Sequence, residues 1–237
     1  MKFINWMKKK NFDICLYGHL SFDNIFIKFK NITSIGCMGN VWKDIKSFNP
    51  NLKVSLIPTS IGESIVLINE EESKRTSKSI LNIFSNKPKI ESSKIYHLMY
   101  INELPDISFI SELDGFVTAD VCNGNLLDID SDYLTYIDLL FISDEDCHFD
   151  VQKLLNKIPN ILLHEKNGST LYRKDSKVYF YAEIVDNVNV LGMGDKLASY
   201  IICNLISNNF NIEKSIQPAH DQITFELKKK ISNNEKI

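Results

Sequence analysis

Short apolar runs alternate with amphipathic stretches along most of this chain. The first run, Asp13–Gly18, has the composition of a buried strand and ends in glycine. Near the other end, Lys196–Ile206 carries apolar residues on one helical face. Strands that alternate with helices indicate an α/β fold with a largely parallel sheet. The further predicted strands are Lys53–Ile57, Ile95–Met99, Gly115–Ala119, Ile137–Ile142, Ile161–His164 and Lys177–Glu183.

Two regions, 24–34 and 64–80, have half-polar strand patterns that differ from these buried runs. Ser64–Asn69 is followed by a charged turn and a second strand pattern, which predicts a hairpin. Half-polar strands fit poorly inside a parallel sheet that is covered on both faces. We therefore predict one domain over residues 1–237, with these two regions as a small separate sheet that projects from it. Further helices are predicted after Gly39–Asn40, over 151–158 and over 212–229.

Composition and charge exclude several classes of protein. Lys and Arg number 27 against 30 Asp and Glu, so bulk positive charge for nucleic-acid binding is absent. No apolar run approaches the roughly 18 residues of a membrane span, and the N-terminus lacks the order of a signal peptide. The five cysteines are dispersed without a CxxC pair, which favours reduced thiols over disulfides or a zinc site. We expect a cytoplasmic protein.

The most informative motif is Gly192-Met193-Gly194-Asp195, directly before the amphipathic helix. Two glycines allow a tight turn that brings backbone N–H groups close to a ligand. The N-terminus of the following helix favours an anion such as phosphate at the same place. Asp195 would then stand where a base takes a proton from an attacking hydroxyl. The alternative is that Asp195 only caps the helix and the glycines only turn the chain.

Two upstream motifs extend this pattern. Gly18 and Asp23 are five residues apart after the first strand, and Gly36-Cys37-Met38-Gly39-Asn40 places glycines and an amide before the next helix. Together with the late glycine motif, they resemble the ribokinase-like (PfkB) family of carbohydrate kinases. The resemblance runs from Asp13 to about Lys230. It implies a ribokinase-like α/β fold with a largely parallel central sheet flanked by helices, and a small β-sheet lid at 24–34 and 64–80.

The resemblance also implies roles for individual residues. Asp195 would be the general base, and the lid would exclude water during transfer. The N–H groups of the turn would stabilise the transferring phosphoryl group. The implied anion hole is Gly192, Met193 and Gly194, and the implied substrate-binding residues are Asp23, Gly36, Gly39 and Asn40. The side chains that we expect to face the substrate from the lid are Ile65 and Leu67.

The nucleotide side departs from the family pattern. The family's NxxE is Ser143-Asp144-Glu145-Asp146 here, so Asp146 is the candidate ligand for Mg²⁺. The family's TxGxxG turn spans 163–168 and keeps only its last glycine. Asn189 replaces an aspartate that often belongs to a monovalent-cation site, which predicts weak activation by K⁺. The implied nucleotide-binding residues are Ser143, Glu165, Asn167, Gly168 and His220, with His220 either near the adenine or simply a surface histidine.

The sequence therefore predicts ATP- and Mg²⁺-dependent phosphorylation of a hydroxyl group on a small sugar or sugar-like molecule. One alternative is a catalytically impaired relative that binds a sugar or a nucleotide, because the nucleotide motifs are degenerate. Another is an unrelated α/β enzyme that shares a glycine turn by chance. We expect no nucleic-acid or membrane partner. A homodimer that pairs through the strand edges of the lid is one option for assembly.

Overall fold

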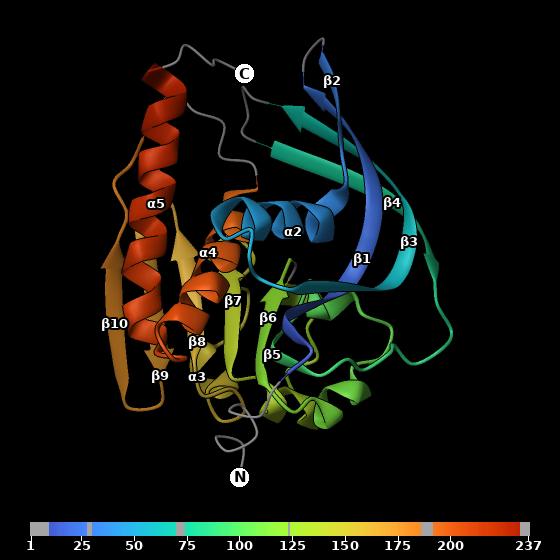
Figure 1. Cartoon of the computed structure of the whole chain (residues 1–237), viewed down its shortest axis with the longest axis vertical. Helices are drawn as coiled ribbons and strands as arrows, with labels where there is room; N and C mark the ends of the chain where they lie inside the picture. The colour runs from blue at the N-terminus through green and yellow to red at the C-terminus, as the bar shows by residue number, and fades with distance from the viewer. Residues whose placement is uncertain (1–9, 28–29, 70–73, 123, 186–191, 233–237) are drawn as a thin grey trace.

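The computed structural model describes residues 10–27, 30–69, 74–122, 124–185 and 192–232. Its described strands form one 10-stranded sheet in the order β10-β9-β8-β7-β6-β5-β1-β3-β4, with β2 paired to β1 (Figure 1). The strands are β1 Phe12–Ile27, β2 Lys30–Ser34, β3 Val54–Asn69, β4 Lys74–Ile83, β5 Ser93–Leu98, β6 Phe116–Val121, β7 Leu139–Ser143, β8 Ile161–Glu165, β9 Gly168–Arg173 and β10 Ser176–Tyr181.

The centre of this sheet is parallel, as the sequence predicts. Every pairing from β8 through β7, β6, β5 and β1 to β3 is parallel. Among the described strands, antiparallel pairing occurs only at the margins, where β9 and β10 form a meander with β8 and where β2 and β4 pair with β1 and β3. Because the central strands are parallel, their carboxyl ends lie along one edge of the sheet, which is where α/β folds place their ligand sites.

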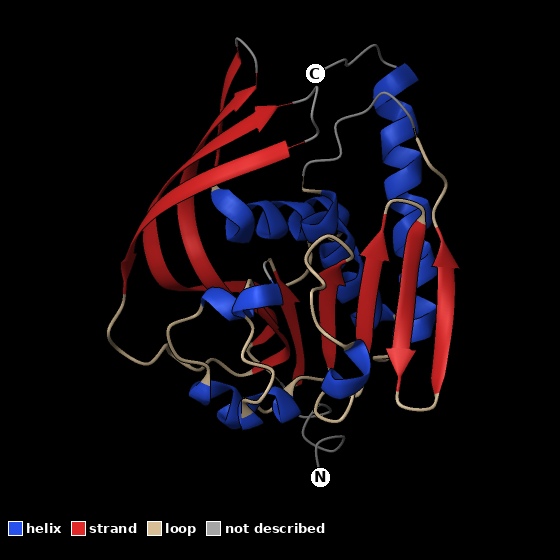
Figure 2. Ribbon diagram, turned by 180° about the vertical axis from the view of Figure 1, so that it is seen from behind, coloured by secondary structure: helices blue, strands red, loops and turns tan. Residues whose placement is uncertain are grey.

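Helices cover both faces of the sheet. The longer helices α2, α4 and α5 lie on one face, and α3 with the short 3₁₀ segments lies on the other (Figures 1 and 2). The helices are α2 Gly36–Phe48, α3 Val151–Leu154, α4 Met193–Ser207 and α5 Ile212–Ser232. The 3₁₀ segments are η1 Ile101–Glu103, η2 Ser108–Glu112, η3 Gly124–Leu126 and η4 Asp132–Tyr136.

Alternate residues of the first strand, β1, pack into the two hydrophobic cores on opposite faces of the sheet. Ile14 and Leu16 pack into the core beneath α2 and α4, whereas Cys15 and Tyr17 pack into the core beneath the 3₁₀ segments. All four side chains are fully buried. A strand with both faces covered has no polar alternation, and this explains the unbroken apolar run from which the strand was predicted.

The lid is continuous with the central sheet, contrary to the separate sheet that the sequence predicts. β1 and β3 are each 16 residues long and run out of the core into the lid. Gly18 does not end its strand: a side chain there would lie 2.7 Å from Cβ of Met99, so glycine permits close packing. Between Gly18 and His19 the β1–β3 register shifts, because Pro58 and Ser60 pair while Thr59 is skipped. This irregularity marks the passage from core to lid.

The two faces of the lid have opposite character. Ser64 and Val66 on β3 face the enclosed side, together with Ser79 and Leu81 on β4. Ile65 and Leu67 point the other way and are each 52% exposed. The expectation that Ile65 and Leu67 face the substrate is therefore wrong. Side chains alternate along a strand, and the expectation chose the wrong phase of that alternation.

Helix boundaries also differ from the predicted ones. α2 begins at Gly36 rather than after Asn40. The helix predicted over 151–158 is a single turn, α3, whose N-cap is Asp150: its carboxylate accepts a hydrogen bond from the backbone N–H of Gln152 at 2.9 Å. α5 continues through Pro218. None of the helices in the described ranges combines the length and apolar character that crossing a membrane requires.

Candidate active site

A cavity of about 440 Å³ lies between the inner face of the lid and the carboxyl ends of the central strands. Its wall includes Asp23 and Asn40 from the predicted substrate site, Gly192 and Asp195 from the glycine motif, and Asp146. These residues come from β1, α2, the start of α4 and the segment after β7. Segments that are far apart in the sequence thus meet in one cavity, at the edge where the parallel strands end.

Asp195 lies in the first turn of α4, three residues after the N-cap. The N-cap is Gly192, in the left-handed region at φ +76°, and a glycine has no side chain with which to cap the helix. Asp195 is therefore not the N-cap residue, as the capping alternative requires. The Tyr100 hydroxyl donates to Oδ1 of Asp195 at 3.4 Å. A carboxylate beside the N–H groups of a helix start can accept a proton next to a bound anion.

Gly194 lies directly against a histidine that the sequence does not single out. A side chain at position 194 would lie 3.1 Å from Cε1 of His164, which stands at the end of β8. Burial lowers the pKa of His164 to about 4, and the nearby His220 adds to that effect. A neutral imidazole thus packs against the backbone of the predicted anion hole, in a space that only glycine leaves open.

Neighbouring hydroxyl groups hold the two side chains of the predicted sugar-binding site, Asp23 and Asn40. The hydroxyl of Ser21 donates to Oδ1 of Asp23 at 2.7 Å, and the hydroxyl of Ser34 donates to Oδ1 of Asn40 at 3.0 Å. Gly36 is in the left-handed region at φ +68°, and a side chain there would overlap the oxygen of Ser21. Gly39 similarly leaves room for the side chain of Ile35. The glycines stand behind the wall of the cavity, where they allow α2 to approach β1.

Carboxylates dominate the electrostatics of this cavity. Asp120, at the end of β6, is 6% exposed, and burial raises its pKa well above the usual range, with Asp195 and Asp146 adding to the effect. The pKa of the Cys37 thiol is also raised, by burial and by Asp195. Ser143 donates to Asp146 at 2.8 Å, so the two form a closed polar turn. Because a cation would relieve this repulsion, the residues are chemically suited to a hard, oxygen-seeking metal ion.

The predicted nucleotide-binding residues lie elsewhere. Among the described residues that line the cavity, none is Ser143, Glu165, Asn167, Gly168 or His220. Glu165 and Gly168 pair at the β8–β9 turn. His220 is 5% exposed and its Nε2 lies 2.8 Å from Oγ of Ser169, so the surface-histidine alternative is wrong. Burial lowers its pKa to about 4. Asn189, the predicted change at a monovalent-cation site, lies outside the described residues.

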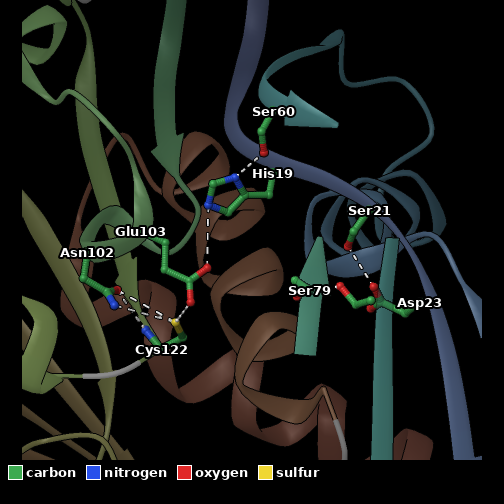
Figure 3. A network of polar contacts seen from close by, with 9 residues as sticks. His19, Ser21, Asp23, Ser60, Ser79, Asn102, Glu103 and Cys122 are labelled. Atoms are coloured by element: carbon green, nitrogen blue, oxygen red, sulfur yellow. Dashed lines mark hydrogen bonds and ion pairs between the residues drawn. The ribbon is translucent and has the colours of Figure 1, made fainter. Parts of the chain in front are cut away.

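A second polar group in the cavity wall was missed from the sequence. Figure 3 shows His19 between Ser60 and Glu103, with Cys122 and Asn102 next to Glu103. Nδ1 of His19 is 2.5 Å from Oγ of Ser60, and Nε2 is 3.6 Å from Oε2 of Glu103. The thiol of Cys122 donates to Oε1 of Glu103 at 3.1 Å. His19 lies within the Gly18–Asp23 motif, and this position was the one sequence signal that could have placed it in the substrate site.

Comparison with known proteins gives matches at the level of structure alone. The sequence matches no protein-family model and no curated protein. A probable sugar kinase from Rhizobium etli superposes with a TM-score of 0.68 at 11% identity, over 90% of this chain and 93% of that chain. A nucleoside kinase from Methanocaldococcus jannaschii, an archaeal member of the ribokinase family, gives 0.65 at 13% identity over 93% of both chains.

A third structure with this architecture is a pyrophosphate-dependent kinase in the ribokinase family, complexed with a pyrophosphate analog and myo-inositol. It gives a TM-score of 0.61 at 14% identity, over 91% of this chain and 95% of that chain. All three identities are too low to carry a function across, but the coverage is nearly complete in both directions. The strand order, the covering helices and these superpositions agree, and the chain therefore has the ribokinase-like fold.

Proposed function

We propose that this protein is a kinase that transfers a phosphoryl group to a hydroxyl of a small sugar or sugar-like molecule. The observation that carries the proposal is the position of Asp195. Its carboxylate lines the same cavity as Asp23 and Asn40 and lies in the first turn of α4 rather than at its N-cap. One wall is thus suited to hydroxyl groups, and the helix start is suited to a phosphate.

The proposed reaction assigns each group a step. Asp23 and Asn40 hold hydroxyls of the acceptor by hydrogen bonds. Asp195 accepts the proton of the reacting hydroxyl as its oxygen bonds to phosphorus, and the bond from phosphorus to the leaving phosphate oxygen breaks. The N–H groups of Gly192, Met193 and Gly194 stabilise the charge on the transferring group. The lid strands limit the access of water to this step.

The phosphoryl donor is proposed to be ATP with Mg²⁺. Five carboxylates line the cavity, and among its described lining residues none is Lys or Arg. An anionic donor therefore needs charge compensation, and Mg²⁺ supplies it by binding phosphate oxygens. Asp146 and Glu145 are the proposed ligands. The described residues contain no ready-made group of three His, Cys, Asp or Glu for a metal, and Mg²⁺ commonly keeps several waters and uses one or two carboxylates.

A specific observation favours a second candidate, a binding protein with an impaired nucleotide site. Ser143, Glu165, Asn167, Gly168 and His220 remain the proposed nucleotide-binding residues, yet none lines the cavity that contains Asp195. The retained Asp195 favours the enzyme, because a binding protein has no use for a base at that position. Because one structural neighbour is a pyrophosphate-dependent kinase, pyrophosphate belongs beside ATP in any test of the donor.

The outer face of the lid supports a proposed homodimer. Phe22, Ile65 and Ile80 are 58%, 52% and 77% exposed and lie on adjacent strands of that face. Charged residues share this face, since Glu63 pairs with both Phe22 and Ile80 and Lys78 pairs with Ile65. Exposed apolar side chains among them favour coverage by a second surface. Sedimentation velocity on the native protein and on Ile80→Lys tests the proposal: we expect a dimer that the variant converts to a monomer. A cytoplasmic location remains a prediction from the sequence.

The substitution Asp195→Asn tests the function directly. Turnover is measured with ATP or pyrophosphate and Mg²⁺ against ribose, inosine and myo-inositol. Loss of a general base lowers rates by about 10²–10⁴-fold, whereas folding should be nearly unchanged because Asn has almost the shape of Asp and position 195 is not the N-cap. Asp175→Asn, in the exposed β9–β10 turn, is the matched control. A variant at position 195 that keeps more than about a tenth of the native rate would contradict the assignment. Full turnover in excess EDTA would contradict the role of Mg²⁺.

A further inference from the structure

The irregular pairing between β1 and β3 directs a histidine into the cavity. Pro58 and Ser60 pair with consecutive residues of β1, so Thr59 is an extra residue on β3. Such bulges often re-aim side chains next to functional sites. As a result His19 and Ser60 stand directly opposite each other, with Nδ1 of the imidazole 2.5 Å from the Ser60 hydroxyl. This cross-strand pair fixes the orientation of the ring.

The other ring nitrogen, Nε2, is directed at Glu103 in the wall of the cavity. His19 is 5% exposed and lines the cavity, and its buried Nε2 makes no hydrogen bond of normal geometry. The carboxylate of Glu103 faces Nε2, with Oε2 3.6 Å away. Because the facing group is an acceptor, the favoured tautomer carries its proton on Nε2 and accepts the Ser60 hydroxyl proton at Nδ1. A buried N–H without a well-formed hydrogen bond is costly, and a ligand that accepts from it at normal geometry lowers that cost.

Glu103 is itself held in place. The Cys122 thiol donates to Oε1 at 3.1 Å, which leaves Oε2 directed at His19 (Figure 3). Burial lowers the pKa of His19, and the carboxylate and backbone carbonyl of Glu103 oppose this only in part. The imidazole is therefore neutral at pH 7, and the contact with Glu103 is a donor facing an acceptor across a gap rather than a closed ion pair.

We propose that His19 and Glu103 form a second hydroxyl-binding subsite for the acceptor, and that the acceptor is an uncharged polyhydroxylated molecule. A hydroxyl oxygen fits between Nε2 and Oε2, because points 3.6 Å apart can both lie at hydrogen-bond distance from one oxygen. That oxygen accepts from His19 and donates to Glu103. Only a group that is both donor and acceptor satisfies the pair, which selects a hydroxyl over a carboxylate or a phosphate.

The surrounding charge agrees with an uncharged acceptor. Asp23, Glu103 and Asp195 all line the cavity. A sugar phosphate or a sugar acid would bring a further negative charge among them without a metal of its own, and like charges at such distances disfavour binding. His19 and Asp23 lie four residues apart on one face of β1, about 13 Å between Cα atoms at the usual rise of a strand. The acceptor is therefore contacted at two separate places along the strand.

This subsite rests on the proposed function for the identity of the acceptor, but its test does not need catalysis. Binding of inosine, 2′-deoxyinosine and 3′-deoxyinosine, and of ribose and 2-deoxyribose, is measured by calorimetry without any phosphoryl donor. The proteins are the native chain, His19→Ala, Glu103→Gln and Ser60→Ala, with His148→Ala as the control at an exposed histidine. Melting temperatures establish that each variant is folded. Glu103→Gln changes a partly exposed side chain, so it still tests the subsite if His19→Ala does not fold.

We expect Kd to rise about 3–10-fold for His19→Ala and about 10–100-fold for Glu103→Gln, the range for hydrogen bonds to neutral and charged groups. The rise in Kd should vanish for the one deoxy analogue that lacks the hydroxyl bound between His19 and Glu103. Ser60→Ala should raise Kd by a smaller factor, and for the same analogues. Equal losses on every analogue, unchanged Kd, or no binding of any of these neutral compounds to the native chain would overturn the proposal. If binding behaves as expected but no phosphoryl transfer occurs, the proposed kinase function fails while the subsite stands.

Discussion

The Tyr100 hydroxyl lies 3.4 Å from Oδ1 of Asp195, and this contact joins the segment after β5 to the start of α4. Tyr100 has φ +51° and ψ +61°, a left-handed conformation that is uncommon for a residue with a side chain. Such conformations persist where the surrounding structure holds them and concentrate at functional sites. The tyrosine also lines the cavity. It therefore acts as a positioning residue for the proposed base.

Replacing Tyr100 by Phe keeps the ring and removes the hydrogen bond. With the proposed activity, we expect kcat/KM to fall about 3–10-fold, the cost of one hydrogen bond to a charged group at a long distance. The melting temperature should change little. Tyr133→Phe, at a tyrosine that is 39% exposed on the 3₁₀ segment η4, is the control. An unchanged kcat/KM in Tyr100→Phe would show that Asp195 is oriented without it.

The contact between Gly194 and His164 predicts that the effect of Gly194→Ala on stability depends on the histidine ring. Alanine is favoured over glycine in helices by about 1 kcal/mol, but a methyl group at 194 would lie 3.1 Å from the half-buried ring of His164. We expect Gly194→Ala to give no gain in melting temperature in the native background, and to lower the activity. In a His164→Ala background the same substitution should stabilise the protein. Equal changes in melting temperature in the two backgrounds would show that the two residues are independent.

Gly36 and Gly192 both have a left-handed backbone but, within the described ranges, only Gly36 is crowded by a neighbouring side chain. Alanine substitutions at the two positions therefore distinguish the cost of backbone strain from the cost of crowding. A side chain at Gly36 would overlap Ser21, whereas a side chain at Gly192 would meet no atom of the described residues within 4 Å. We expect Gly192→Ala to cost only the backbone term, about 1–2 kcal/mol. Gly36→Ala should lower the free energy of unfolding by clearly more than that and weaken acceptor binding, because it displaces the group that donates to Asp23. Urea unfolding of both variants measures the difference, and equal losses would contradict the crowding at Ser21.

Buried histidines predict that the protein loses stability in mild acid. Burial lowers the pKa of His97 to about 3, and the pKa of His164 and that of His220 to about 4, from an ordinary value of 6.5. Above pH 6.5 their full contribution is present. As the pH falls from 6.5 towards 4, the unfolded chain takes up protons that the folded chain does not. Each histidine then removes up to about 1.4 kcal/mol per pH unit.

Two carboxyl groups with raised pKa values, Asp44 and Asp120, act in the opposite direction, so the net slope is smaller than the sum for the histidines. Urea unfolding at pH 7.5, 6.0 and 5.0 measures the slope. His220→Gln should make it shallower by about one proton. A free energy of unfolding that is constant over this range would contradict the burial of these side chains.

Much of the core was predictable because periodicity and burial are linked. The run Ile14–Tyr17 is buried on both faces of the sheet, and such strands are apolar at every position. The glycine motifs were also readable, because a left-handed φ at Gly36 and Gly192 leaves few alternatives to glycine. Those motifs led to Asp23, Asn40 and Asp195, which the fold brings into one cavity.

The parts that were not predictable depend on long-range geometry. The extra residue Thr59 sets the direction of His19, and nothing in the local pattern signals a bulge there. Whether Ile65 or Val66 faces inward depends on the phase of a half-apolar strand, which both assignments fit equally well. Glu103 and Cys122 join the cavity only because β5 and β6 are neighbours in the sheet, and a single sequence does not reveal that pairing.

Because β1 and β3 run from the core into the lid without a break, this part of the lid tolerates few insertions or deletions. No loop lies between His19 and Asp23, and beyond the Thr59 bulge the two strands pair in register up to Ile27 and Ile68. Removal of one residue between Gly18 and Phe22 would turn Phe22 towards the cavity and carry the hydroxyl-binding carboxylate to the outer surface. Variation in this half of the lid therefore favours substitutions and changes of two residues, because a one-residue change needs a further bulge to restore the phase.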